Sequence, residues 1–61
     1  MNVYEFCRLY IEGGEDMEIW SISKQKTVFE GTFDEAIFSD FSCEEVASFG
    51  IENGKICINI E

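Results

Sequence analysis

The sequence predicts a small, mainly β domain of the α+β class: a curled antiparallel five-stranded sheet or small barrel, in the order β-β-β-α-β-β, with one short helix. Three observations lead to this prediction. Asn53-Gly54 separates two alternating apolar segments, Gly13-Gly14 separates two segments rich in β-forming residues, and Thr32 to Glu35 fits a helix capping box. At 61 residues the chain forms a single domain, residues 1–61.

The first hairpin is predicted to join residues 3–11 and 17–23 through a three-residue loop at 13–15. The expected cross-strand pairs are Ile11 with Met17, Leu9 with Ile19, Arg8 with Trp20, and Phe6 with Ile22. The Arg8–Trp20 pair would be a cation–π contact. Large apolar side chains then stand on both faces of the hairpin, so either the sheet curls into a barrel or a second subunit covers it.

The middle of the chain changes from strand to helix. Lys24-Gln25-Lys26 is expected to be a polar turn that leads into a third strand over Thr27–Gly31. The capping box at Thr32 then predicts a helix near residues 33–40, with apolar residues at 33, 36, 37 and 41. Ser42 to Glu45 repeats the box, but the strand pattern after Val46 leaves no room for a second helix.

The C-terminal hairpin is predicted from Asn53-Gly54, the preferred pair for a two-residue type I′ turn. This turn sets the register of the two strands. The expected pairs are Glu52 with Lys55, Ile51 with Ile56, Phe49 with Ile58, and Ala47 with Ile60. Because side chains alternate along a strand, the three apolar pairs share one buried face.

The charge pattern is one-sided, since thirteen acids face four bases and give a formal charge of −9. Between Lys26 and Lys55 there is no Lys or Arg. Such a run is ordinarily solvated surface, but in a chain this rich in aromatics it also fits a surface for a basic protein partner, one that handles nucleic acid. The expected partner-binding residues are Glu30, Asp34, Glu35, Asp40, Glu44 and Glu45.

Catalysis is not predicted, because the chain has no histidine and an acidic surrounding disfavours thiolate formation. Carboxylates could hold Mg²⁺ for phosphodiester chemistry, which leaves a metal-dependent nuclease as the enzyme alternative. The candidate ligands are Asp34, Glu35, Glu44 and Glu45, or Glu15, Asp16 and Glu18. Acids at a helix start and in turns have ordinary structural roles, however. We therefore expect no catalytic residue, no metal, no cofactor and no small-molecule substrate.

The three cysteines, Cys7, Cys43 and Cys57, show no metal-binding spacing and are expected to be small buried hydrophobes in a reducing compartment. No signal sequence and no apolar run long enough to span a bilayer is present. We expect a cytoplasmic protein without membrane contact. A chain this short buries only about 60% of its unfolded surface, and we expect it to form a homodimer.

Two other functions stay open. Arg8, Lys24 and Lys26 all fall on the first predicted β-meander, and in an oligomer they could form a basic stripe that binds nucleic acid. The aromatic residues of the same meander, Tyr4, Phe6, Tyr10 and Trp20, could stack on bases, although a place in the core is their commoner role. The chain could also be an accessory domain with an unrelated partner.

In its size, its acidity and its single-domain build, the chain resembles the small inhibitors that phages and mobile elements use against host restriction and CRISPR nucleases. Some members of that class imitate DNA, and others are compact β-rich oligomers. The resemblance implies an acidic inhibitor that binds a nucleic-acid-processing machine in the cytoplasm of a bacterial host. It rests on no motif and assigns no residue a role.

Overall fold

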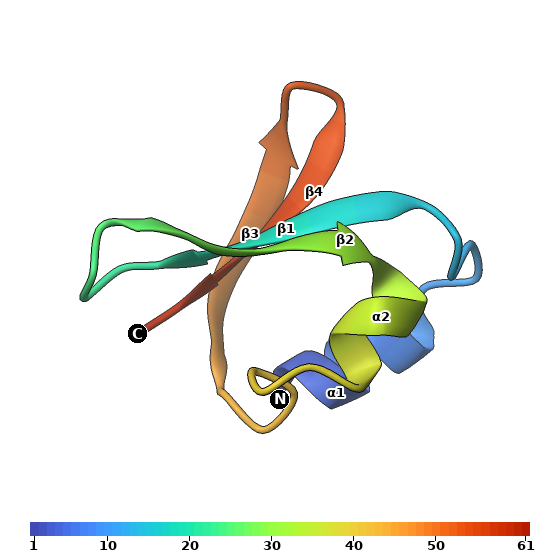
Figure 1. The fold of residues 1–61 in the computed structure, drawn as a ribbon, viewed down its shortest axis with the longest axis horizontal. Helices are drawn as coiled ribbons and strands as arrows, with labels where there is room; N and C mark the ends of the chain where they lie inside the picture. Colours follow the sequence, from blue (N-terminus) through green and yellow to red (C-terminus); the bar gives the residue numbers. More distant parts are fainter.

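The computed structural model describes residues 1–61 as two helices and one four-stranded sheet (Figure 1). The elements are α1 (Val3–Leu9), β1 (Asp16–Ser21), β2 (Lys26–Thr32), α2 (Phe33–Ile37), β3 (Val46–Glu52) and β4 (Lys55–Ile60). The strand order is β2-β1-β4-β3, with β1 and β4 parallel and the outer pairs antiparallel. The mainly β α+β class is confirmed, whereas the five antiparallel strands and the barrel are wrong.

The segment predicted to form the first strand forms the helix α1 instead. Asn2 caps it: its side chain accepts a hydrogen bond from Glu5 N at 2.8 Å, and Glu5 Oε1 accepts one from Asn2 N at 2.9 Å. The helix buries Val3 and Cys7, which lie one turn apart on a single face. The predicted strand pairs of residues 3–11 are therefore absent. Arg8 contacts Tyr4 instead of Trp20, with its guanidinium 5.6 Å from the ring centroid.

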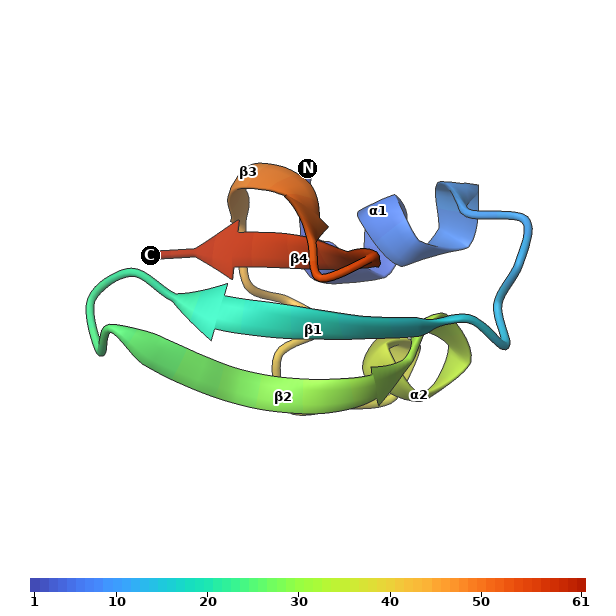
Figure 2. The same cartoon turned by 90° about the horizontal axis from the view of Figure 1, so that it is seen from above.

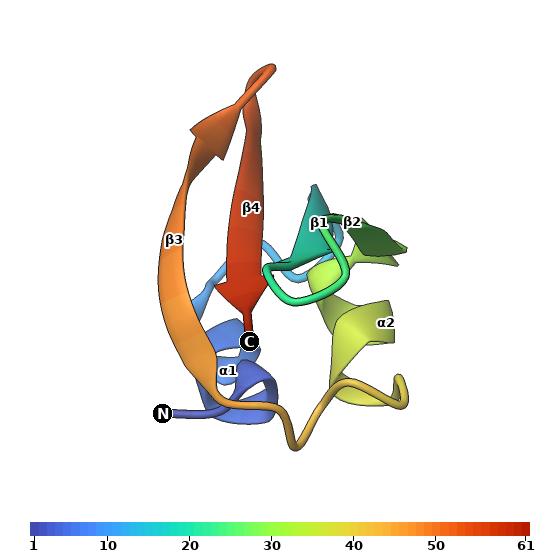
Figure 3. The ribbon, with the colours of Figure 1, turned by 90° about the vertical axis from the view of Figure 1, so that its left-hand side faces the viewer.

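The two helices lie on one side of the curved sheet, as Figures 2 and 3 show. The core between them consists of Val3, Cys7, Met17, Ile19, Phe33, Ala36, Ile58 and Ile60. The stacking of Tyr10 on Phe33, with ring centroids 4.2 Å apart, joins the end of α1 to α2. The opposite side of the sheet, which we call the open face, has no covering layer and carries Glu18, Trp20, Cys57 and Asn59.

The middle of the chain largely follows the prediction. The expected polar turn precedes β2, and Gln25 adopts a positive φ of 54° within it. A β-bulge in the β1–β2 pairing falls between Ile19 and Trp20. The capping box places Thr32 before α2, as predicted, but the helix ends at Ile37; residues 38–44 form turns and bends, and Glu45 forms an isolated β-bridge with Asn2. The second box at Ser42 produces no helix, also as predicted.

The C-terminal hairpin has the predicted turn, with φ of 54° at Asn53 and 79° at Gly54. Glu52 pairs with Lys55, Ile51 with Ile56 and Phe49 with Ile58, as expected. The predicted pairing of Ala47 with Ile60 is wrong, because an irregularity between Val46 and Ser48 places Val46 opposite Ile60. The burial of this face is also incomplete: Phe49 is 60% exposed and Ile51 78% exposed, because β3 is an edge strand.

Besides the short chain, two features would favour a dimer: a first hairpin with two apolar faces, and a free edge on the C-terminal strand with Ile56, Ile58 and Ile60. Neither appears in the fold. Residues 3–9 form a helix, so there is no first hairpin with two apolar faces. The strand β4 lies between β1 and β3, so its isoleucines do not form a free edge, and Ile58 and Ile60 are buried. The dimer stays a prediction, and the exposed edge strand β3 becomes the place to test it.

Candidate functional site

The six acids predicted to bind a partner lie between residues 30 and 45, and we call them the acidic strip; Glu30 pairs with Glu18 and so stands on the open face, whereas α2 lies on the other side of the sheet. The members of the strip are Glu30 in β2, Asp34 and Glu35 in α2, and Asp40, Glu44 and Glu45 in the segment that leads to β3. All six are exposed. In Figure 1 the strip can be followed from the end of β2 through α2 and along the yellow-to-orange segment to the start of β3.

Two members of the strip have structural partners. Glu35 completes the cap of α2, since its Oε1 accepts a hydrogen bond from Thr32 N at 2.8 Å. Glu45 lies 3.3 Å from the amino group of Met1, which is the only ion pair in the protein. The remaining four, Glu30, Asp34, Asp40 and Glu44, have neither a side-chain hydrogen bond nor an ion pair. Their charge is available to a partner.

The start of the strip is widened by a segment far away in the sequence. The backbone of Phe33 donates to Glu15 O at 3.2 Å, and that of Asp34 donates to Gly13 O at 3.0 Å. These bonds hold the loop before β1 against the start of α2. They bring Glu15 close to Asp34, and strand pairing places Asp16 opposite Thr32. Local sequence patterns do not reveal this contact, because it joins segments separated by a hairpin.

An exposed aromatic residue stands within the acidic strip. Phe38 caps the C-terminus of α2 between Glu35 and Asp40 and is 87% exposed. Phe38 is not among the site residues predicted from the sequence. A signal was present, however, because the apolar helical spacing at 33, 36, 37 and 41 leaves residue 38 outside the buried set. A large apolar side chain among acids is the arrangement of an interface anchor with a polar rim.

The three basic residues of the alternative site do not lie together. Arg8 belongs to α1 rather than to a meander, whereas Lys24 and Lys26 lie at the β1–β2 turn, at the far end of the molecule in Figures 1 and 2. Lys24 also lines a small cleft of about 230 Å³ together with Glu44 and Glu61. A single chain therefore presents no continuous basic stripe.

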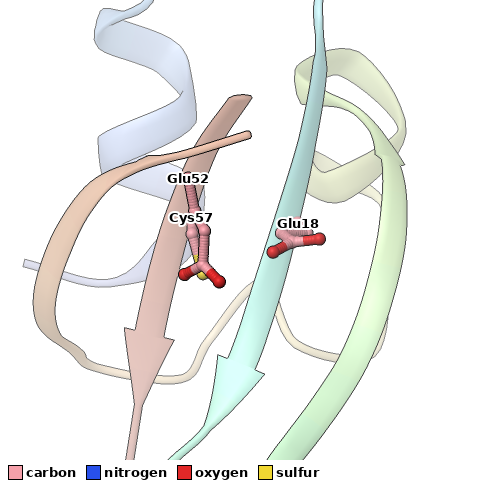
Figure 4. Close-up of side chains that lie close together, drawn as sticks. All are labelled: Glu18, Glu52 and Cys57. Atoms are coloured by element: carbon pink, nitrogen blue, oxygen red, sulfur yellow. The ribbon is translucent and has the colours of Figure 1, made fainter. Parts of the chain in front are cut away.

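The two sets of carboxylates proposed for Mg²⁺ do not converge either. One group of potential metal ligands is present, and it consists of Glu18, Glu52 and Cys57, whose ligand atoms all lie within 4.8 Å of one another. Figure 4 shows the Glu52 carboxylate over the Cys57 sulfur, with the Glu18 carboxylate beside them. Sequence analysis named Glu18 in a different set. It missed Glu52 and Cys57 because their proximity depends on the pairing of β1 with β4.

The cysteines occupy three environments. Cys7 and Cys57 are buried as expected, but Cys43 is exposed, because it lies in the turn segment after α2. Burial raises the pKa of the Cys7 thiol to about 11. Burial also raises the pKa of the Cys57 thiol, and the neighbouring Glu18 and Glu52 add to the effect. Both buried thiols are therefore poor nucleophiles near neutral pH.

Comparison with protein-family models gives no match, and neither curated proteins nor solved structures match the chain. No helix in the structure has the length and apolar character needed to cross a membrane.

Proposed function

We propose that the protein is an inhibitor that binds a basic protein surface of a nucleic-acid-processing machine. The observation that carries the proposal is the acidic strip, in which four unpaired carboxylates accompany an exposed phenylalanine, Phe38. A channel that binds nucleic acid is lined with Lys and Arg, which neutralise the phosphates. An acidic surface with an apolar centre is complementary to such a channel.

The charge balance of the whole chain supports this function. The protein has thirteen acidic and four basic side chains but only one ion pair. The cation of that pair is the terminal amine rather than a Lys or Arg side chain. The negative charge is therefore not neutralised within the fold. A net charge of −9 steers the molecule toward a basic partner and increases the association rate at low salt.

The strip and Phe38 contribute to binding in different ways. The carboxylates take the place of backbone phosphates, and their contribution weakens as salt increases. Phe38 offers apolar area that a nucleic-acid backbone lacks, and its contribution does not depend on screening. An imitator of the nucleic-acid backbone with such an anchor retains affinity at salt concentrations that release the nucleic acid itself.

The proposal is tested with immobilised protein exposed to a bacterial lysate, followed by elution with short duplex DNA. We expect the eluted fraction to contain a nucleic-acid-binding protein, and we expect Phe38→Ala to reduce its affinity tenfold or more, as for an interface anchor. Asp40→Asn combined with Glu44→Gln should also weaken binding and make it less dependent on salt. Phe38 caps α2 through its backbone N–H alone, and the side chains of Asp40 and Glu44 form no ion pair, so the fold should be retained.

The matched control is Thr27→Lys combined with Ser48→Lys, which changes the net charge by the same two units at exposed positions outside the strip. This control should bind as the wild type does. If both double variants lose the same affinity, the loss reflects net charge rather than the acidic strip. If Phe38→Ala and the Asp40/Glu44 variant both bind as the wild type does, the proposal is rejected. If the chain binds nucleic acid directly instead, Lys24→Glu with Lys26→Glu should abolish that binding.

A further inference from the structure

A second group of side chains, independent of the acidic strip, converges on the open face of the sheet. Glu18 in β1 lies directly opposite Cys57 in the parallel neighbour β4, and Glu52 ends the adjoining strand β3. Their ligand atoms lie within 4.8 Å of one another (Figure 4). Three strands thus each contribute one potential metal ligand to the same point.

No ion pair neutralises the carboxylates of this group. Neither Glu18 nor Glu52 takes part in one, although Lys55 stands opposite Glu52 in the strand register. The only side-chain hydrogen bond to these carboxylates comes from within the group, between the Cys57 thiol and Glu18. Two like charges placed this close without an ion pair are unfavourable, and a bound cation removes that cost.

The thiol of Cys57 is the buried member of the group. The residue is only 7% exposed although no helix covers this face, and its Sγ is directed into the group. It interacts by hydrogen bonding with Glu18 and makes a long contact of 3.8 Å with Asn59 Oδ1. A nine-tenths buried thiol beside two unpaired carboxylates is a feature that the packing of the fold does not require.

Asn59 adds a fourth potential donor atom, its Oδ1, beside Cys57. Its Nδ2 donates to Ser48 Oγ at 3.0 Å, which orients the amide so that Oδ1 faces Cys57 Sγ. In a tetrahedral zinc site, with Zn–S of about 2.3 Å and Zn–O of about 2.0–2.2 Å, neighbouring ligands lie about 3.5 Å apart. The Sγ–Oδ1 distance is already near this value. The exposed Glu52 can bring its carboxylate closer to the other ligand atoms by side-chain rotation.

We propose that Glu18, Glu52 and Cys57 form a Zn²⁺-binding site on the open face, with Asn59 Oδ1 as a neighbouring donor. A thiolate with carboxylate oxygens suits zinc, whereas Mg²⁺ demands an octahedral set of oxygens. On binding, the thiol releases its proton to the solvent, and the sulfur bonds to the metal. The metal then links β3, β4 and β1, and so fastens the edge strand β3 to the centre of the sheet.

The test uses Co²⁺ as a spectroscopic substitute for Zn²⁺ in the reduced, full-length chain. We expect one equivalent of Co²⁺ to produce a thiolate-to-cobalt charge-transfer absorption in the near ultraviolet, which Zn²⁺ abolishes and Mg²⁺ does not. Cys57→Ser should remove the band. Glu18→Gln and Glu52→Gln should each weaken Co²⁺ binding tenfold or more, and Zn²⁺ should raise the melting temperature of the wild type but not that of Cys57→Ser.

The matched controls are Cys43→Ser, which removes the exposed thiol, and Glu44→Gln, which removes a carboxylate outside the group. Both should bind Co²⁺ as the wild type does. A band that survives Cys57→Ser or disappears in Cys43→Ser overturns the site, as does the absence of saturable binding in the wild type. If Cys57→Ser fails to fold, the exposed variant Glu52→Gln decides, and unchanged affinity in that variant rejects the proposal.

Discussion

The three cysteines show how one residue type takes different properties from its surroundings. Cys7 faces the core between α1 and the sheet, Cys57 faces the open side of β4, and Cys43 lies exposed in a turn. The sequence predicted burial for all three, and two of them are buried. Cys43 differs because the segment after α2 forms turns on the surface, where a small apolar side chain has no neighbours to pack against.

The raised pKa of Cys7 gives a pH dependence of stability. The folded chain keeps this thiol protonated up to about pH 11, whereas the unfolded chain releases the proton near its ordinary pKa of 9.0. The unfolded state therefore holds fewer protons above pH 9, and the stability contribution that is complete below pH 9 is lost as pH rises toward 11. Urea unfolding at about pH 8 and about pH 10.5 measures this loss.

The control for this experiment is Cys7→Ala. It lowers the stability at both pH values, because it leaves a small cavity, but it should lose less stability than the wild type between them. An equal loss in the two proteins would show that other groups, such as Lys and Tyr, account for the alkaline dependence.

At the scale of elements, both helices depend on their caps. The helices have 7 and 5 residues, well below the ~12–15 residues that an isolated helix needs in water. Each begins with a reciprocal capping box, from Asn2 with Glu5 and from Thr32 with Glu35. The caps satisfy backbone N–H groups that such short helices cannot satisfy internally.

We therefore expect Asn2→Ala to destabilise the protein by about 1 kcal/mol. The matched variant Asn2→Asp, which keeps an oxygen acceptor at the same position, should cost much less. Chemical denaturation with far-ultraviolet circular dichroism measures both. A cost of Asn2→Ala within error of zero would show that packing of Val3 and Cys7 alone holds α1 in place.

The elements that could be predicted from the sequence are those with a local signal. The Asn53-Gly54 turn determines the register of its hairpin, and the box at Thr32 determines the start of α2. The helix α1 was mistaken for a strand because of its β-forming residues. It carried a usable signal, however: Asn2 and Glu5 form a capping pair, and apolar residues stand at 3, 6, 7 and 10.

At the scale of the whole molecule, the sheet leaves β2 and β3 as edge strands. An edge strand presents unpaired backbone groups that can pair with a second copy. On β3 the apolar Phe49 and Ile51 are largely exposed, and Phe49 packs edge-on against Phe6 with ring centroids 4.8 Å apart. This edge is the most favourable place for the predicted dimer.

We expect the wild type to have about twice its 7.0 kDa monomer mass at micromolar concentration, measured by light scattering after size exclusion. Ile51→Lys should give a monomer, whereas Ile11→Lys, a matched change at a position 94% exposed outside β3, should not. Added salt should favour the dimer, because it screens the repulsion between two chains of charge −9. A clean monomer in the wild type would contradict the prediction.

The candidate sites differ in how far the sequence predicts them. The acidic strip follows the chain, so its residues could be named from the charge pattern alone, although Phe38 could not. The group of Glu18, Glu52 and Cys57 forms because β1 and β4 run parallel, with Ile19 opposite Ile58. No short turn connects two parallel strands, so the residues that pair across them cannot be identified from local spacing in the sequence.

The central place of β4 has a consequence for how the chain acquires its structure. Residues 16–32 can form their hairpin early, but β1 then keeps an unpaired edge until residues 55–60 emerge from the ribosome. The strand that joins the two halves of the sheet follows the other five elements in the sequence. The sheet therefore cannot be completed before residues 55–60 are available. A nascent chain interrupted before residue 55 holds the β1–β2 hairpin and β3 with no strand between them, and exposed apolar surface of this kind is what chaperones recognise.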